Sequence, residues 1–407
     1  MNSSKNRNNK RLILLIPLFI FYCLAFSVFY FYFSRLIYGI GHYPWKPYTV
    51  ARINPNPEYL PGTIGPTLFS TNHRGFRGDD PYEADLLILV LGGSTTEGFY
   101  LDDKNTWPQV MANKLNKNGS FGKVVAANAA KAGLQIRHYY LQAMELLPEL
   151  EKVRFTIILP GPNDVMSFYS EPYKKIINSR KLDEIAFGYV AASSPLWSRE
   201  LIQSEFNFFK NIAKNQIKRL LMKIHLKKPS KGAFWQDSDG AMYKEKRRDR
   251  LLAEKIDLPH ELYPMLDERL EYYRKYMRKT IDEIILNKCL PVLVTHPVNY
   301  FDGMPETEKR LWYIGHLNYR FKNSDSPVYL TEKSIADLLE LFNQVSRDLA
   351  VEYSSDVILI DLAEILKGKT GLYYDSWHFN IEGAKQVGEI VADALIYDTV
   401  NTKSDKR

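Results

Sequence analysis

Five short apolar runs constrain the fold of this chain more than any other feature of its sequence. They lie at residues 85–91 (DLLILVL), 123–127 (KVVAA), 155–159 (FTIIL), 290–295 (LPVLVT) and 357–360 (VILI). Strands that are apolar along their whole length are typical of a parallel sheet with helices on both faces, because each side chain then faces a covered surface. The runs therefore predict buried parallel strands.

Segments with helical character separate these runs. Thr106 can cap a helix that has Pro108 in its first turn, residues 139–150 are helical in pattern, and the last helix starts after Asn380. Strands that alternate with helices predict an α/β protein with a three-layer α/β/α, flavodoxin-like fold. We expect this domain to comprise residues 71–170 and 288–398. Apolar residues make up 45% and charged residues 25% of the 407 residues, which is typical of a globular protein.

The first 34 residues predict a membrane anchor. Residues 1–11 contain Lys5, Arg7, Lys10 and Arg11 and no acid, and residues 12–33 carry no charge. This run is long enough to span a bilayer, and the basic residues before it favour a cytoplasmic N-terminus. A cleaved signal peptide has a shorter apolar core and a small-residue cleavage site, and a buried core helix is the other alternative. We expect a single-pass anchor at residues 12–34 in the cytoplasmic (inner) membrane, with the rest of the chain extracytoplasmic.

Two segments differ from the strand–helix pattern. Residues 35–70 are rich in proline and glycine and predict an extended linker. Residues 171–287 predict a helical insertion that is strongly basic, because residues 197–255 contain fifteen Lys or Arg against seven Asp or Glu. The insertion either packs on the core with a solvated basic face or contacts anionic lipid or an anionic polymer. Nucleic acid is a poor fit for a chain outside the membrane.

Polar residues follow the strands at the edge where parallel sheets bind their ligands. Gly92-Gly93-Ser94-Thr95 follows the first run, and Gly133 lies in the loop after the second. Gly161-Pro162-Asn163-Asp164 follows the third, and Asp375-Ser376-Trp377-His378 lies between the last run and the last helix. One edge of the sheet is thus expected to carry a serine, a histidine, a carboxylate and an asparagine.

These residue types are those that acyl transfer needs. An imidazole can take the proton of a serine hydroxyl at neutral pH, and a carboxylate orients that imidazole and stabilises its cation. Amide donors stabilise the oxyanion, here the Asn163 side chain and the backbone N–H groups of Gly133 and Ser94. We expect glycine at position 133 to allow a close backbone approach. No cofactor is required, and neither cysteine, Cys23 or Cys289, has metal-site spacing.

At these four blocks the sequence resembles the SGNH hydrolase superfamily, the GDSL-type lipases, esterases and acyltransferases. The resemblance implies Ser94 as nucleophile, His378 as base and Asp375 as its orienting carboxylate, with Ser94, Gly133 and Asn163 forming the oxyanion hole. Gly93 stands where the motif that names the family has aspartate. The resemblance covers residues 85–395, interrupted by the insertion.

Each block alone has a simpler interpretation. Gly-Gly-Ser is often a turn or a phosphate-binding loop, Asn-Asp after Gly-Pro is a common turn, and Asp-x-x-His can be a helix cap with a surface histidine or a pair of metal ligands. An α/β-hydrolase elbow is excluded, because Thr96 stands in place of its second glycine.

Three further residues are candidates for substrate contact. His296 ends the fourth apolar run, Trp377 lies inside the last block, and Arg77 precedes the first strand in a Gly-Phe-Arg segment. Arg77 has a structural role or a solvated loop position as alternatives, and Trp377 can equally close the pocket.

Three functions follow from the sequence. The chain is an extracytoplasmic serine esterase for O-acyl, above all O-acetyl, groups of a glycan or lipid. Alternatively, it is an O-acyltransferase of an envelope polysaccharide with the same residues, or a non-catalytic envelope assembly protein on the same fold.

Overall fold

The fold is taken from a computed structural model, which describes residues 41–170, 184–191, 239–317 and 327–404. The predicted anchor at residues 12–34 and most of the predicted basic insertion lie outside these residues. None of the helices in the described ranges combines the length and apolar character needed to cross a membrane. The described residues from Tyr43 to Tyr189 and from 239 to 404 belong to one compact unit, which the following paragraphs describe.

A five-stranded parallel sheet forms the centre of this unit. Its strands lie in the order β11 (Ile358–Ile360), β9 (Leu290–Val294), β6 (Val153–Leu159), β4 (Leu86–Gly92) and β5 (Val124–Asn128). Every neighbouring pair is parallel. All five strands coincide with the five apolar runs, so the predicted α/β fold with a parallel sheet is confirmed.

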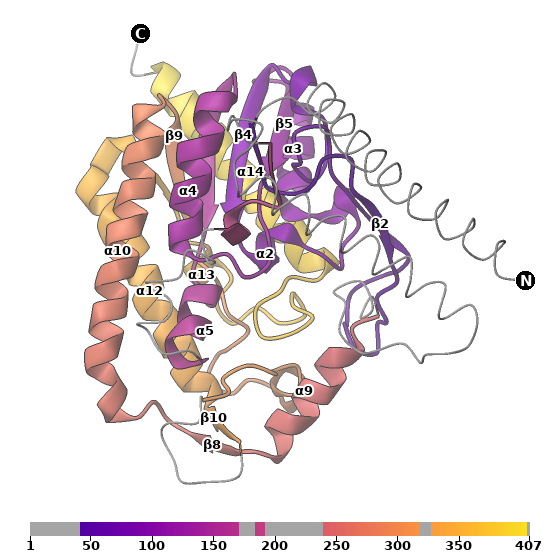
Figure 1. The fold of residues 1–407 in the computed structure, drawn as a ribbon, viewed down its shortest axis with the longest axis vertical. Coiled ribbons are helices and arrows are strands. Elements are labelled where there is room, and N and C mark those ends of the chain that lie inside the picture. Colours follow the sequence, from indigo (N-terminus) through magenta and orange to yellow (C-terminus); the bar gives the residue numbers. More distant parts are fainter. Residues whose placement is uncertain (1–40, 171–183, 192–238, 318–326, 405–407) are drawn as a thin grey trace, which may run out of the picture. The chain divides into compact units, whose positions relative to one another are not determined.

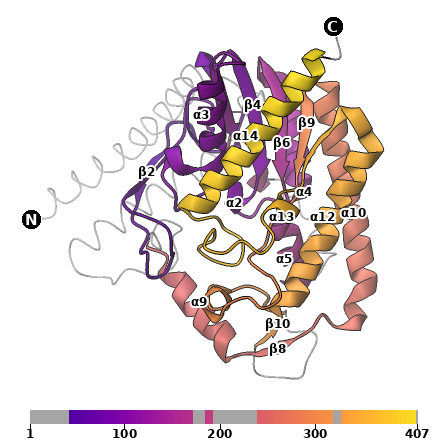
Figure 2. The same ribbon diagram turned by 180° about the vertical axis from the view of Figure 1, so that it is seen from behind.

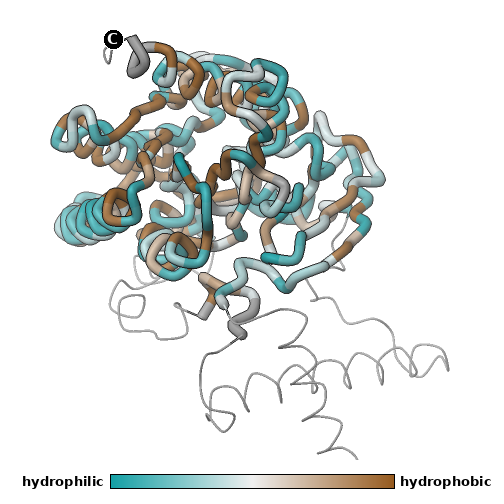
Figure 3. Tube along the Cα trace, turned by 90° about the horizontal axis from the view of Figure 1, so that it is seen from above, coloured by the Kyte–Doolittle hydropathy of each residue, from teal (hydrophilic) through white to brown (hydrophobic). Residues whose placement is uncertain are grey.

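Helices cover both faces of the sheet, which explains why its strands are apolar throughout. Leu87, Leu89 and Leu91 of β4 belong to one core cluster with α4 (Ile136–Leu146), α10 (Tyr263–Leu286) and α12 (Glu332–Tyr353). Leu86, Ile88 and Val90 belong to another, with α3 (Trp107–Asn118) and α14 (Ile381–Ser404). Figure 1 shows α4 and α10 on one face, and Figure 2 shows α14 across the other. In Figure 3 the brown, hydrophobic stretches run mainly through the interior of the molecule, and the teal, hydrophilic stretches lie mainly on its outside.

The other described elements are short. The remaining helices are α2 (Ser94–Glu97), α5 (Pro162–Ser170), α9 (Ala241–Leu252), α11 (Glu306–Lys309) and α13 (Leu362–Ile365), and the remaining strands are β1 (Gly41–Tyr43), β2 (Val50–Ile53), β3 (Thr67–Ser70), β7 (Tyr189–Ala191), β8 (Glu254–Ile256) and β10 (Val328–Leu330). Because α10 belongs to the main core cluster, the C-terminal part of the predicted insertion is a covering helix of the sheet.

The described part of the predicted linker, residues 41–70, is folded, which corrects the expectation of an extended segment there. Strands β2 and β3 pair antiparallel, and Ile53, Leu60 and Phe69 are buried in an aromatic cluster with Tyr100, Tyr243 and Tyr374. Proline and glycine suggested an extended chain, but the alternating apolar residues between them provide a surface that the domain buries.

Arg77 joins this segment to the core. Its guanidinium, with 2% of the residue exposed, donates to the backbone carbonyls of Glu97, Gly98 and Leu101 and pairs with Asp103 at 2.7 Å. Phe69 covers its other side, 4.6 Å from the guanidinium carbon to the ring centroid. All its donors thus point into the protein, so Arg77 is a structural residue and the expected substrate contact is wrong.

Replacing Arg77 with methionine is expected to lower the free energy of unfolding by about 3 kcal/mol or more, because several buried acceptors lose their donor. Arg74→Met is the matched control, since Arg74 pairs with Glu149 in a partly exposed position and is expected to cost about 1 kcal/mol. Urea unfolding of both variants measures the difference. Equal losses would contradict the structural role of Arg77.

Candidate active site

The hydroxyl of Ser94 stands at the carboxyl end of β4, which lies between β6 and β5 in the sheet. β4 ends at Gly92, Gly93 caps the short helix α2, and Ser94 is its first residue. Both glycines are required by close contacts. A Cβ on Gly92 would lie 2.2 Å from the Thr96 hydroxyl oxygen, and one on Gly93 would lie 2.6 Å from the side-chain nitrogen of Asn163. The Gly-Gly pair therefore brings the serine next to the asparagine.

Two short hydrogen bonds connect Ser94 to His378 and Asp375. The Ser94 Oγ lies 2.7 Å from His378 Nε2, and His378 Nδ1 lies 2.7 Å from Asp375 Oδ2. Because a carboxylate only accepts, Nδ1 carries the proton and Nε2 is left to accept the serine proton. The structure thus brings together all three residues that the sequence predicted as a triad.

Asp375 is held by its own loop. Its Oδ1 accepts the backbone N–H groups of Trp377 at 3.0 Å and His378 at 2.8 Å, and the residue is fully buried. The ring of Tyr374 stacks on the His378 imidazole, with the ring centroids 5.4 Å apart and the planes at 4°. These contacts fix both the carboxylate and the imidazole plane, so the base is oriented before any ligand binds.

The predicted oxyanion donors lie on two loops that contact each other. Asn163, at the start of α5, donates one side-chain N–H to the carbonyl of Leu134 at 2.8 Å, and its second N–H has no acceptor among the described residues. Gly133 precedes Leu134, is exposed, and has a φ of 82°, a region that favours glycine. A Cβ on Gly133 would meet no protein atom within 4 Å, so the positive φ and not crowding by the protein favours glycine here, and the close approach of its backbone to an oxyanion stays a prediction.

The buried side chains of Asp164 and Arg269 connect these two loops. The carboxylate of Asp164 accepts the backbone N–H of Ile136 at 3.1 Å, at the start of α4. Arg269 of α10 lies 3.4 Å from Asp164 and donates to Gln135 and Ser167. Both Asp164 and Arg269 are buried. The loop that carries Gly133 is therefore tied to the loop that carries Asn163 through a buried ion pair.

His296 and Trp377 are core residues, which corrects the expectation that they contact substrate. His296 is buried: its Nδ1 donates to the carbonyl of Pro297 at 2.7 Å, and its Nε2 accepts from the Thr95 hydroxyl at 3.1 Å. Burial lowers the pKa of His296 to about 3, so the ring is neutral. Through Thr95 the ring contacts α2. Trp377 is 1% exposed and belongs to the main core cluster.

Glu97 is a buried carboxylate at the site that sequence reasoning missed. It lies three residues after Ser94, is 1% exposed, and neither of its carboxylate oxygens has a hydrogen-bond partner of normal geometry among the described residues. Burial raises the pKa of Glu97 to about 7, and the Ala132 amide and the charges of Arg77, Lys131 and His378 only partly oppose this. An acid inside the short, otherwise uncharged helix Ser-Thr-Thr-Glu was the available signal.

No metal site accompanies these residues in the described part of the chain, where no group of three or more His, Cys, Asp or Glu side chains is placed to hold an ion.

Comparisons with known proteins find similarity in structure and none in sequence. No family model and no curated protein matches the chain. Similar solved structures include the acetylxylan esterase Axe2 from Geobacillus stearothermophilus, which is 12% identical with a TM-score of 0.37 and covers 77% of this chain and 93% of its own. The psychrotrophic esterase EstA from Pseudoalteromonas is 11% identical with a TM-score of 0.38, covering 77% and 98%. A member of the lipolytic G-D-S-L family from Veillonella parvula is 9% identical with a TM-score of 0.36, covering 76% and 97%.

The Veillonella protein is named as a member of the G-D-S-L family, which the four sequence blocks resemble, and the other two are named as esterases. At such low identity and TM-score, however, the similarity carries no weight for the function. We base the functional proposal on the residues of the site.

Replacing Glu97 with glutamine is expected to change how stability depends on pH. The pKa of Glu97 in the folded protein, about 7, lies above its ordinary value of 4.5, so the folded state binds this proton more tightly than the unfolded chain. The wild type therefore loses stability as pH rises from about 4.5 to 7, by up to about 3 kcal/mol, and Glu97→Gln does not.

The measurement is the difference in unfolding free energy between Glu97→Gln and wild type at about pH 4.5 and about pH 8. These values lie near the start and the end of the titration of the Glu97 carboxyl. The difference is expected to move in favour of the variant at the higher pH. The control is Glu382→Gln, which makes the same chemical change at an exposed site. A difference that stays constant with pH would show that Glu97 titrates as it does in water.

Proposed function

We propose that this chain is a serine esterase that hydrolyses O-acyl, above all O-acetyl, esters of a glycan or lipid. The observation that carries the proposal is the pair of 2.7 Å contacts that connects Asp375, His378 and Ser94 in that order. This order of carboxylate, imidazole and hydroxyl activates a serine for attack on an ester carbonyl.

The proposed reaction has two steps, acylation of Ser94 and hydrolysis of the acyl-enzyme, and His378 accepts and returns a proton in each. The Ser94 oxygen attacks the ester carbonyl while His378 Nε2 takes the serine proton, and the alcohol then leaves with that proton. Water hydrolyses the acyl-enzyme with His378 again as base. Asp375 keeps the imidazole in the required tautomer and stabilises its cation.

The oxyanion is proposed to bind the free N–H of Asn163 and the backbone N–H groups of Gly133 and Ser94. A donor of this kind contributes about 3 kcal/mol to the stability of the transition state. The amide of Gly133 makes no hydrogen bond with any described residue, which supports its assignment.

The proposed location is outside the cytoplasmic membrane. The support for it is the charge-free run at residues 12–33 and the basic residues before it. An enzyme held there by one N-terminal helix meets envelope or exported glycans and membrane lipids, which are therefore the proposed substrate classes.

Ser94→Ala is expected to abolish labelling by a fluorophosphonate probe and to lower hydrolysis of p-nitrophenyl acetate by about 10³-fold or more, because the attacking oxygen is lost. The measurement uses the full-length protein. Ser354→Ala is the control, since Ser354 is an exposed serine directly after α12 whose hydroxyl donates to the carbonyl of Val351.

Labelling that persists in Ser94→Ala would exclude Ser94 as the nucleophile. Labelling that is absent from the wild type would exclude the esterase. A glycan acceptor added to the same assay distinguishes transfer of the acyl group from its hydrolysis.

A further inference from the structure

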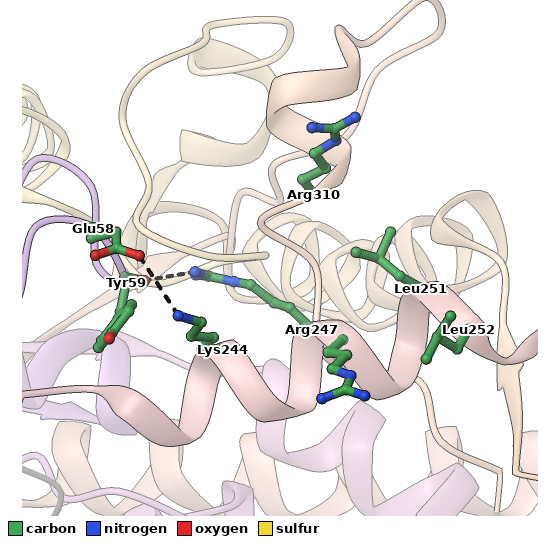
Figure 4. A pocket seen from close by; sticks show the side chains of 8 residues that line it. Glu58, Tyr59, Lys244, Arg247, Leu251, Leu252 and Arg310 are labelled. Carbon is green, nitrogen blue, oxygen red and sulfur yellow. Dashed lines mark hydrogen bonds and ion pairs between the residues drawn. The ribbon is translucent and has the colours of Figure 1, made fainter.

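A basic pocket lies beside α9, away from the serine. It has a volume of about 530 Å³, within the size range of ligand sites, and Figure 4 shows α9 along one side with Glu58, Tyr59 and Arg310 around it. Its charged lining residues are Glu58, Lys244, Arg247, Arg248 and Arg310. Four cationic residues and a single carboxylate thus line the pocket.

Little compensates the positive charge of this pocket. Lys244 and Glu58 are 3.7 Å apart, and both side chains are more than half exposed, so their pairing is weak. Arg248 and Arg310 form no ion pair with any described residue. An excess of exposed guanidinium groups attracts anions and presents the paired donors that carboxylates and phosphates accept.

Arg247 forms the floor of the pocket and connects it to the candidate triad. Its guanidinium donates to three backbone carbonyls, those of Tyr59 at 2.6 Å, Tyr374 at 2.6 Å and Leu311 at 3.0 Å. These neutral acceptors satisfy its hydrogen bonds but leave its charge in place. Tyr374 immediately precedes Asp375, and its ring stacks on His378. The pocket and the triad therefore share one loop.

The rest of the lining suits a sugar. Tyr59 offers an aromatic ring, and Leu251 and Leu252 are 53% and 78% exposed, so the pocket has apolar surface next to its cations. A sugar acid combines a C–H face with a negative group in a similar way. A pocket of this volume that shares a loop with the triad favours a unit of the acylated substrate over a membrane surface.

We propose that this pocket is a subsite for the anionic groups, carboxylate or phosphate, of an acidic O-acylated glycan. The subsite rests on the proposed function, because the glycan that it binds is the polymer whose acyl groups Ser94 removes. Lys244 and Arg310 bind the anion, Arg247 maintains the floor, and the bound chain runs from the pocket toward Ser94.

Binding to the full-length Ser94→Ala variant tests the subsite without any catalytic turnover. Calorimetry measures the affinity for oligogalacturonate, which carries carboxylates, for a glycerol phosphate oligomer, and for a neutral xylo-oligosaccharide. We expect the variant to bind at least one of the two anionic oligomers, more weakly at high salt, and not the neutral one. The oligomer that binds identifies the anionic group.

Adding Lys244→Gln and Arg310→Gln together is expected to weaken the binding about tenfold, because two exposed charge contacts are lost. Lys246→Gln is the matched control, since Lys246 is an exposed cation of the same helix that does not line the pocket. Added to Ser94→Ala, Lys246→Gln is expected to leave the affinity of the Ser94→Ala variant unchanged.

Activity supplies a second measurement. In the protein with Ser94 present, the Lys244→Gln, Arg310→Gln variant is expected to raise KM for an acetylated polyuronate about tenfold with kcat unchanged, and to hydrolyse p-nitrophenyl acetate at the normal rate. If no ester reacts, the proposed esterase function is contradicted. The calorimetric binding of the anionic oligomers still decides whether the pocket is an anion subsite.

Three outcomes would overturn the subsite. They are equal binding of the neutral oligosaccharide, unchanged binding of the anionic oligomers after the double substitution, and binding to phosphatidylglycerol vesicles that the double substitution weakens while no oligosaccharide binds. The last outcome would assign the pocket to lipid headgroups.

Discussion

The hydrogen bond between Ser94 and His378 is the interaction on which the site depends. It joins residues 284 positions apart, one at the end of strand β4 and the other in the loop before α14. The two loops meet because strands of a parallel sheet all end at the same edge. The remaining contacts of the site serve to hold these ends still. Asp375 is fixed by its own loop amides, and Gly93 is small enough for Asn163 to lie against the serine turn.

Buried charges support this edge and connect it to distant parts of the chain. Arg77 binds the β2–β3 segment to α2, Arg269 binds α10 to the oxyanion loops through Asp164, and Arg247 binds α9 to the triad loop. A buried guanidinium is costly unless its donors are satisfied, and Arg77 and Arg247 are satisfied mainly by backbone carbonyls. Such contacts fix loops that have no regular hydrogen bonding of their own. Glu97 and Arg269 are less well satisfied, since both Glu97 oxygens and two of the Arg269 nitrogens have no hydrogen-bond partner of normal geometry among the described residues.

Sequence reasoning succeeded where the signal is local. Each apolar run became a strand of the sheet, because a segment that is apolar on both sides has no stable place except between two layers. Ser94, His378 and Asp375 were also identified, since a strand end followed by a glycine and a polar residue can be recognised within a few positions. Reasoning was wrong for His296, Trp377 and Arg77. Polar or aromatic residues near a site look alike in sequence whether they face a ligand or the core.

The amino-acid sequence by itself determined the sheet, the order of its loops and the types of side chain at its edge. These signals, apolar runs and the glycine or proline residues that end them, extend over only a few neighbouring residues. Only the tertiary structure decided which side chains are buried and what they contact. Residues 41–70 fold onto the domain, α10 covers the sheet, and Glu97 is buried three residues after the serine. The physical reason is that burial depends on partners far away in the chain, and the same proline-rich, basic or acidic segment is solvated or enclosed according to what packs against it.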